Sequence, residues 1–145
     1  MSYIADRQNQ LLTIQVISCI LIMGHGLSNI YYFLDERGNS PVKEFITNLP
    51  VKERAKVFAY FHELMRQGYN LRRPMADYLG HGIYELRPKN NRIFYFLFLR
   101  DSAVLLHAIK KKTYKIPESD LNICLKRKSN VEGSKSIKRL ELRGD

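Results

Sequence analysis

The clearest pattern along the chain is an apolar stripe at helical spacing between positions 51 and 67. Apolar side chains recur there every three or four residues, and charged side chains fill positions between them. The stripe consists of Val57, Phe58, Phe61, Leu64 and Met65. This pattern predicts an amphipathic helix from about Val51 to Gln67, which Gly68 ends because glycine readily adopts the backbone conformation that follows a helix.

A shorter helix and a strand are predicted before this stripe. The run Ile30–Leu34 is rich in β-prone residues and is followed by the turn signal Asp35–Asn39. Ser40-Pro41 is typical of a helix start, because serine caps the N-terminus and proline is favoured at the first helical position. Asn48-Leu49-Pro50 then breaks the helix. The two helices would form a hairpin with one face for a sheet.

Three closely spaced apolar runs predict strands in the middle of the chain. They cover Gly82–Arg87, Arg92–Leu99 and Ala103–Ile109, with short polar turns between them. Such short connections require antiparallel pairing. The segment Tyr69–Gly82 before them is predicted to be a loop.

The last helix is predicted to start at Ile116–Asp120 and to end near Lys128. Residues 129–145 are polar, basic and poor in large apolar side chains, so a disordered tail is predicted there. The order β-α-α-β-β-β-α indicates an α+β domain over residues 30–128. Its helices would cover one face of an antiparallel sheet and leave the other face to bind a partner.

Residues 1–29 form an N-terminal extension in which only Asp6 and Arg7 are charged. The mostly apolar run Leu11–Met23 is shorter than the roughly 20 residues that a membrane-spanning helix needs. It lacks the features of a signal peptide, so we expect no membrane attachment. Two interpretations stay open: an element packed on the domain, or an extension produced by an early start codon, with Met23 as the internal start.

The positive charge of the chain indicates the kind of partner that it binds. The 145 residues carry a formal charge of +10, which indicates a polyanionic partner such as nucleic acid, an acidic protein or an anionic membrane. Between positions 84 and 128, 11 lysines and arginines face 4 acidic residues. The basic character therefore belongs to the half of the chain that holds the three predicted strands.

Cysteine and histidine give no sign of a metal site. Cys19 and Cys124 are far apart and form no CxxC pair, so they are interpreted as small buried hydrophobes in a reducing cytosol. The 4 histidines show no ligand spacing. No metal ion or cofactor is expected.

Two arginines are predicted to meet at one end of the strands. Side chains alternate along a strand, so Glu85 and Arg87 share a face, and the four-residue connection would set Arg87 opposite Arg92. Two exposed guanidiniums there would repel by a few tenths to about 1 kcal/mol, which is understandable if an anion normally lies between them. The alternative is that both arginines extend into water, each paired with Glu85 or Asp101.

Lys110-Lys111-Lys112 closes the third predicted strand. Cations at the end of a rigid strand hold defined positions, so they can bind a phosphate and stabilise charge that develops during reaction. A basic triplet is also typical of a solvated strand end, and only its combination with the arginines favours a phosphate site. Tyr114 could stack on a base, donate a proton or lie at the rim, and His107 is interpreted as a hydrogen-bonded histidine of the core.

Three segments, in this order, resemble the HigB-like branch of the RelE/ParE toxin superfamily. They are IYYFLDERGNSPVKEFI (30–46), GIYELRPKNNRIFYF (82–96) and LLHAIKKKTYKIP (105–117). The branch includes many phage-derived addiction-module killer proteins. The resemblance implies a RelE-like microbial-RNase-type fold and a cytoplasmic type II toxin that cleaves mRNA, usually on the ribosome, without metal or cofactor. It also implies an antitoxin with a helix-turn-helix domain.

The resemblance assigns roles by position. Arg87 and Arg92 match the strand arginines that hold the scissile phosphate, and one or more of Lys110, Lys111 and Lys112 match basic residues after the last strand. Apart from the resemblance, our hypothesis makes Glu85 the general base and Tyr114 or a lysine the general acid; Tyr114 is an approximate match to a late-chain tyrosine or histidine of relatives.

Two positions depart from the RelE pattern. RelE-type enzymes carry lysines two and four residues before the arginine that matches Arg87, whereas this chain has Glu85 and Ile83. A non-enzymatic toxin or binder therefore stays open, either directed at gyrase, as in ParE relatives, or decayed. A plain basic RNA-binding domain is a third interpretation.

Overall fold

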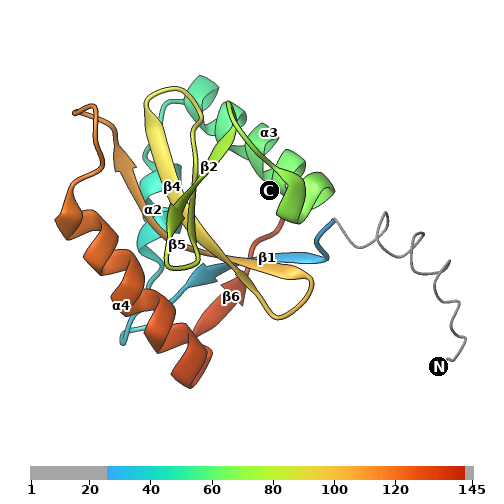
Figure 1. Cartoon of the computed structure of the whole chain (residues 1–145), viewed down its shortest axis with the longest axis vertical. Coiled ribbons are helices and arrows are strands. Elements are labelled where there is room, and N and C mark those ends of the chain that lie inside the picture. Colours follow the sequence, from blue (N-terminus) through green and yellow to red (C-terminus); the bar gives the residue numbers. More distant parts are fainter. Residues whose placement is uncertain (1–25, 143–145) are drawn as a thin grey trace, which may run out of the picture.

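Six strands form one sheet in the order β2-β3-β4-β5-β1-β6 (Figure 1). The structure is a computed structural model that describes residues 26–142, so the apolar run Leu11–Met23 lies outside the described residues. All neighbouring strands pair antiparallel except β1 and β5, which run parallel. The strands are β1 (Asn29–Phe33), β2 (Ala76–Gly80), β3 (Ile83–Leu86), β4 (Asn91–Phe98), β5 (Ser102–Lys110) and β6 (Ile137–Arg139).

The helices begin and end largely where the sequence predicts. The structure contains α2 (Pro41–Thr47), α3 (Val51–Gln67), the short 3-10 helix η1 (Gly68–Asn70) and α4 (Glu118–Ser134). At the start of α2, the Ser40 hydroxyl accepts the N–H of Lys43 at 3.2 Å. Gly68 ends α3 with φ of 52°, which is in the left-handed region that favours glycine. The α+β class and both boundaries of α3 are therefore confirmed.

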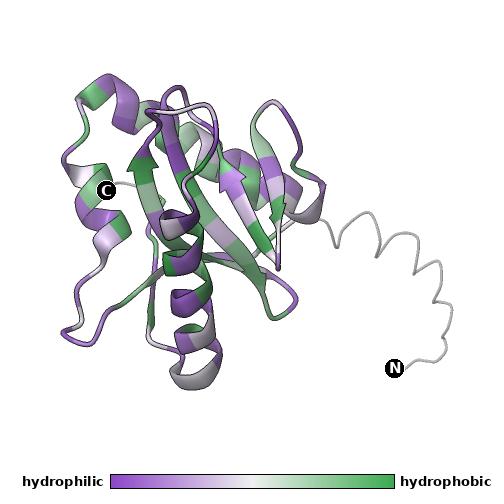
Figure 2. Cartoon of the chain, turned by 60° about the vertical axis from the view of Figure 1, so that its left-hand side comes forward, coloured by the Kyte–Doolittle hydropathy of each residue, from purple (hydrophilic) through white to green (hydrophobic). Residues whose placement is uncertain are grey.

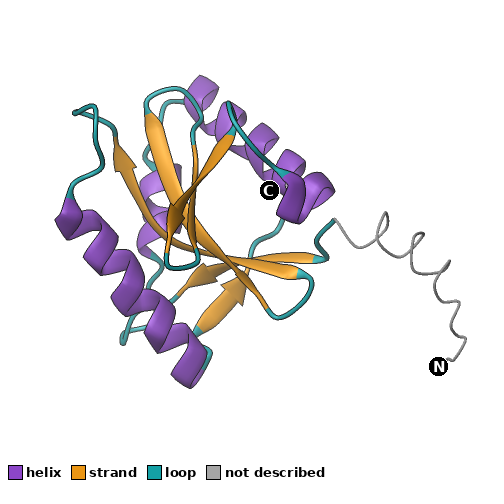
Figure 3. Ribbon diagram, viewed as in Figure 1, coloured by secondary structure: helices purple, strands orange, loops and turns teal. Residues whose placement is uncertain are grey.

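Helices cover both faces of the sheet, so the prediction of one open face is wrong. Helices α2 and α3 lie on one face and α4 lies on the other (Figure 3). The cause lies in β4, whose side chains are buried on both faces and therefore require cover on both. Ile93 and Tyr95 pack in the core with α3, whereas Phe94 and Phe96 pack in the core with α4.

Helix α4 is mostly polar and packs on the sheet through a few apolar side chains. In Figure 2 the strands are largely green, whereas α4, in the foreground, shows mainly purple residues. Its contribution to the core is small and includes Cys124 and Val131, two turns apart on one face. Cys124 is fully buried, as interpreted from the sequence, and this burial raises the pKa of its thiol to about 12.

The segment predicted as a loop before the strands contains a strand, β2, so that prediction is wrong. Strand β2 pairs only with β3 and lies at the edge of the sheet. Asp77 and Gly80 are poor strand formers, and the register shifts between Tyr78 and Gly80. Because β2 is held by pairing with β3 more than by burial of its side chains, its hydrophobic pattern is too weak to predict a strand.

The C-terminal tail is also ordered through the described residues, so the prediction of disorder from residue 129 is wrong for 129–142. Helix α4 continues to Ser134, and β6 then pairs antiparallel with β1. The N–H of Leu140 donates to the carbonyl of Ile30 at 2.8 Å, and its side chain is buried among the residues packed on α3. A few well-spaced apolar residues therefore hold a segment of low hydrophobicity.

One extra residue interrupts the pairing of β4 with β5. Phe94 lies opposite His107 and Tyr95 lies opposite Leu105, so Leu106 has no partner of its own across the strand. Leu106 and His107 consequently lie toward the same face, that of α4. Beyond this bulge, the alternation of β5 is shifted by one residue.

Leu140→Ala is expected to lower the free energy of unfolding by about 2 kcal/mol, the low end of the cost for a buried leucine, since the site lies at the edge of the core. Urea denaturation would measure the loss. Arg139→Ala, which removes an exposed neighbour with only a long ion pair to Glu141, is the matched control. Equal stability of the two variants would contradict a packed tail.

Candidate active site

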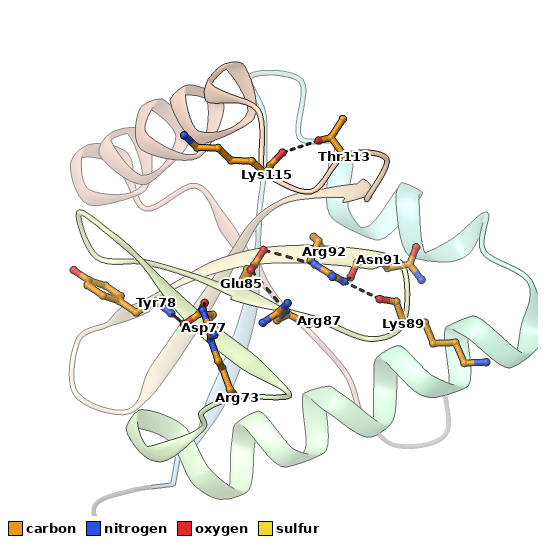
Figure 4. A network of polar contacts seen from close by, with 10 residues as sticks. All are labelled: Arg73, Asp77, Tyr78, Glu85, Arg87, Lys89, Asn91, Arg92, Thr113 and Lys115. Atoms are coloured by element: carbon orange, nitrogen blue, oxygen red, sulfur yellow. Dashed lines mark hydrogen bonds and ion pairs between the residues drawn. The ribbon is translucent and has the colours of Figure 1, made fainter.

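Glu85 lies between two guanidinium groups on the α4 side of the sheet (Figure 4). Arg87 Nε is 3.8 Å from Glu85 Oε2, and Arg92 Nε is 3.8 Å from Glu85 Oε1. The register pairs Leu86 with Ile93, and the next step sets Arg87 opposite Arg92, as the sequence predicts. The anion between the arginines is the chain's own carboxylate, which agrees with the predicted pairing to Glu85.

The three side chains differ in their access to solvent. Glu85 and Arg92 are buried, with side-chain exposures of 8% and 7%, whereas that of Arg87 is 28%. Arg92 Nη1 donates to the carbonyls of Lys89 and Asn91, each at 2.8 Å. The guanidinium of Arg92 is therefore fixed by the β3–β4 turn, while Arg87 is open to a ligand.

The carboxylate of Glu85 is held in an unfavourable environment. Its Oε1 atom is buried and has no hydrogen-bond partner within the described part of the protein. Burial raises the pKa of Glu85, against the opposing effects of Arg92 and Arg87. Burial also lowers the pKa of Arg92. A buried acceptor without a donor costs about 1–3 kcal/mol, so the position of this carboxylate is energetically costly.

Strand β2 and the segment before it extend this row of charges with Asp77 and Arg73, which were not among the predicted site residues. Asp77 lies opposite Glu85 in the β2–β3 pair, and Arg73 Nη2 is 2.7 Å from Asp77 Oδ2. The Arg73 hydrogen bond is the main cause that lowers the pKa of Asp77. No pattern in the sequence identifies them, because ADYLG has the weak hydrophobic pattern of an edge strand and Arg73 precedes it.

The lysine triplet is divided between the two faces of the sheet. Lys110 lies opposite Asn91, and both side chains contact Glu53 of α3. The expectation that Lys110 lines the same site as the arginines is therefore wrong. Lys111 is on the arginine side, where its charge lowers the pKa of Glu85, and Lys112 is exposed.

Tyr114 lies on the loop after β5 and is 98% exposed. Lys111 Nζ is 5.7 Å from the centre of the Tyr114 ring, so the two side chains lie next to each other. Thr113 Oγ1 donates to the carbonyl of Lys115 at 2.6 Å and closes this loop (Figure 4). The position suits a residue at the rim of the site.

His107 is hydrogen-bonded, as interpreted from the sequence. Its Nε2 is 2.8 Å from Asp120 Oδ1, and its ring stacks on Phe94 with 5.8 Å between the ring centres. Within residues 26–142, no three or more His, Cys, Asp or Glu side chains are grouped so that they could hold a metal ion. The same residues contain no helix long and apolar enough to cross a membrane.

Comparison with protein families gives one match. The model of a family described as phage-derived protein Gp49-like (DUF891) matches residues 44–129. This segment contains Glu85, Arg87, Arg92 and Lys111, while β1 and β6 lie outside it. No curated protein matches the chain.

Proposed function

The chain belongs to the phage-derived Gp49-like family, a toxin-related family similar to RelE and HigB, and from this premise we propose that it is the toxin of a toxin–antitoxin pair and an endoribonuclease. One observation carries the nuclease proposal: the buried Glu85 carboxylate, with an oxygen that lacks a hydrogen bond, lies between two arginines. The proposed substrate is mRNA, bound on the ribosome in the cytoplasm. The proposed fold type is that of RelE-like microbial RNases.

In the proposed reaction, Glu85 acts as the general base. It takes the proton of a ribose 2′-hydroxyl, and the 2′-oxygen attacks the adjacent phosphorus. The bond from phosphorus to the 5′-oxygen of the next nucleotide breaks, which leaves a 2′,3′-cyclic phosphate. Burial supports this role because it raises the pKa of Glu85 toward neutral pH, where a base transfers protons most effectively.

The arginines would stabilise the negative charge of the pentacoordinate phosphorus. Arg92 is held in place by two backbone carbonyls and needs little reorganisation during the reaction. Arg87 is the more exposed of the two and can turn from Glu85 to a phosphate oxygen. A general acid must protonate the departing 5′-oxygen, and Lys111 or Tyr114 at the rim would supply that proton.

The partner implied by the family would inhibit the toxin. We propose an antitoxin with a helix-turn-helix domain, whose acidic segment would cover the cations around Arg87. The +10 charge of the chain favours an acidic inhibitor as well as RNA. A reading frame for such a protein beside that of the toxin would support the pairing.

Inducible expression with mapping of mRNA 5′ ends tests the nuclease proposal. We expect growth arrest together with new 5′ ends, and purified protein should cleave RNA but leave DNA of the same sequence intact, because DNA lacks the 2′-hydroxyl. Arrest without new RNA ends would exclude cleavage as the cause. Co-expression of the neighbouring antitoxin should abolish both effects.

Lys111→Ala is expected to lower the cleavage rate about 10-fold or more, whereas Lys110→Ala should change it much less, since the charge of Lys111 acts on Glu85 and Lys110 contacts Glu53. Both variants remove the same charge from adjacent positions, so each controls for the other. Initial rates on one RNA at constant salt would measure the difference. Equal losses would indicate a general effect of charge on RNA binding and not a specific role for Lys111.

A non-enzymatic toxin is the second candidate, and one observation favours it. Glu85 partly neutralises both arginines, so fewer free cations face a phosphate than the sequence suggests. Such a protein would arrest translation with intact mRNA, or would cause DNA breaks if it acted on gyrase. Either result in the expression experiment would favour this candidate.

A further inference from the structure

A hollow of about 510 Å³ opens beside the charged row, between the end of β5 and the start of α4. Ile109, which lies directly opposite Arg92 in the β4–β5 pair, is part of its wall. Directly opposed residues on a sheet have their β-carbons about 4.5–5.5 Å apart. The hollow therefore begins one strand away from Arg92, on the same face of the sheet as Glu85.

The lining of the hollow combines three kinds of side chain. Its apolar part comes from Ile109, Ile116 and Pro117, and the lysines Lys110, Lys111 and Lys112 supply positive charge. An apolar wall next to cations suits a nucleobase attached to a phosphate chain. The hollow has one carboxylate, that of Asp120 in the first turn of α4.

The Asp120 carboxylate is held in a fixed orientation. Its Oδ1 atom is 2.8 Å from His107 Nε2, and the other ring nitrogen of His107 faces Arg127 Nη1 at 3.5 Å. Arginine can only donate, so Nδ1 is the acceptor and Nε2 carries the proton that is donated to Asp120. Arg127 is itself fixed to the carbonyl of Leu106 at 2.9 Å. The acceptor in the hollow is thus preorganised.

We propose that the hollow binds the base next to the cleaved phosphate and that Asp120 selects bases with an exocyclic amino group over uracil. The inference rests on the proposed RNA cleavage. A carboxylate only accepts hydrogen bonds, and the amino groups of adenine, cytosine and guanine donate them. Uracil instead presents a carbonyl oxygen on each side of its single N–H. A carboxylate that accepts from this N–H also meets one of the two carbonyl oxygens, so the contact is weaker than with an amino group.

The test is a set of RNA oligonucleotides that differ only in the base on each side of the cleaved phosphate. At one of these two positions, we expect the wild-type protein to cleave the adenine, cytosine or guanine substrate about 10-fold faster than the uracil substrate. Asp120→Asn should bring this ratio close to one, because the amide both donates and accepts. Its oxygen still accepts from His107, so the fold should be retained, which a melting curve checks.

Glu118→Gln is the matched control, since it removes the same charge from the same end of α4 at an exposed position. It should leave the base ratio unchanged. A wild-type protein that cleaves all four substrates equally would overturn the inference, and so would an Asp120→Asn variant with an unchanged ratio.

A binding experiment separates this inference from the nuclease proposal. Tetranucleotides of adenylate, cytidylate or uridylate are titrated into the protein, and amide shifts of Ile109 and Ile116 are followed by NMR. Tighter binding of adenylate or cytidylate, lost in Asp120→Asn, would support the hollow as a base site even if no RNA is cleaved. Equal affinity for the three, or shifts elsewhere only, would overturn it even if cleavage is real.

Discussion

An Arg87→Ala/Arg92→Ala variant is expected to lose RNA cleavage and growth arrest. Removal of one donor to a developing anion typically costs about 10²–10³ in rate, so loss of both should bring cleavage below detection. The effects will not simply add, because the two side chains flank one carboxylate and act together. Induced growth curves and initial rates on a defined RNA would measure the loss.

The single variants separate chemistry from folding. Arg92 is buried, and its removal leaves the Glu85 carboxylate with one counterion, so the double variant could be inactive because it is unstable. Arg87→Ala keeps Arg92 in place and removes the more exposed cation. It should remain folded and still lose about 10²–10³ in rate.

Arg100→Ala is the matched control for general charge, since Arg100 is exposed in the turn between β4 and β5, away from Glu85. It should retain activity and arrest growth. Full toxicity of a folded Arg87→Ala/Arg92→Ala variant would exclude these arginines from the mechanism, even if cleavage itself is observed.

The second large effect is expected from Glu85→Gln. Loss of a general base typically lowers the rate about 10²–10⁴-fold, and glutamine keeps the shape of the side chain without its basicity. The same change should make the protein more stable at neutral pH, because it removes a carboxylate whose charged form is disfavoured by burial. Loss of activity with gain of stability is the signature we expect.

The sign of the pH dependence follows from the raised pKa of Glu85. Below the ordinary pKa of a glutamate, 4.5, the group is protonated in both the folded and the unfolded chain and has no effect. As pH rises from there to the folded pKa, the unfolded chain loses its proton first, so stability falls. The gain from Glu85→Gln should therefore be small at pH values below about 4 and should grow as the pH rises toward neutral.

Urea denaturation of both proteins at acid and neutral pH would measure this difference. Glu36→Gln, at an exposed position in the loop before α2, should show neither the gain nor the loss of activity. If Glu85→Gln were less stable than the wild type at neutral pH, attraction to the arginines would outweigh the cost of burial. In that case the carboxylate would be a structural ion pair and a poor candidate for the base.

The sequence was sufficient where local pattern determines structure. The boundaries of α3 follow from its apolar stripe, and the approach of Arg87 to Arg92 follows from strand alternation and a short turn. The burial of Glu85 could not be predicted, because residues distant in sequence enclose it. Strand β2 has too weak a hydrophobic pattern to be identified. All helices were expected on one face of the sheet, whereas α4 covers the face opposite α2 and α3.

The same reasoning explains the errors at the C-terminus. Val131, Ile137 and Leu140 are separated by many polar residues, so composition indicates disorder. Each nevertheless packs in one of the two cores, and β6 pairs with the edge of β1. Backbone pairing with the edge of a sheet requires little hydrophobicity. A prediction based on composition does not take such pairing into account.

The bulge at Leu106 determines which lysine serves the site. It reverses the parity of every later residue of β5, so Lys111 and not Lys110 lies on the side of Glu85. If the same residues followed an unbroken alternation, without the bulge, the two lysines would exchange faces. Because three successive residues are lysines, a cation would still face the arginines after the exchange, and the repeated lysine makes the charge of the site insensitive to a one-residue slip.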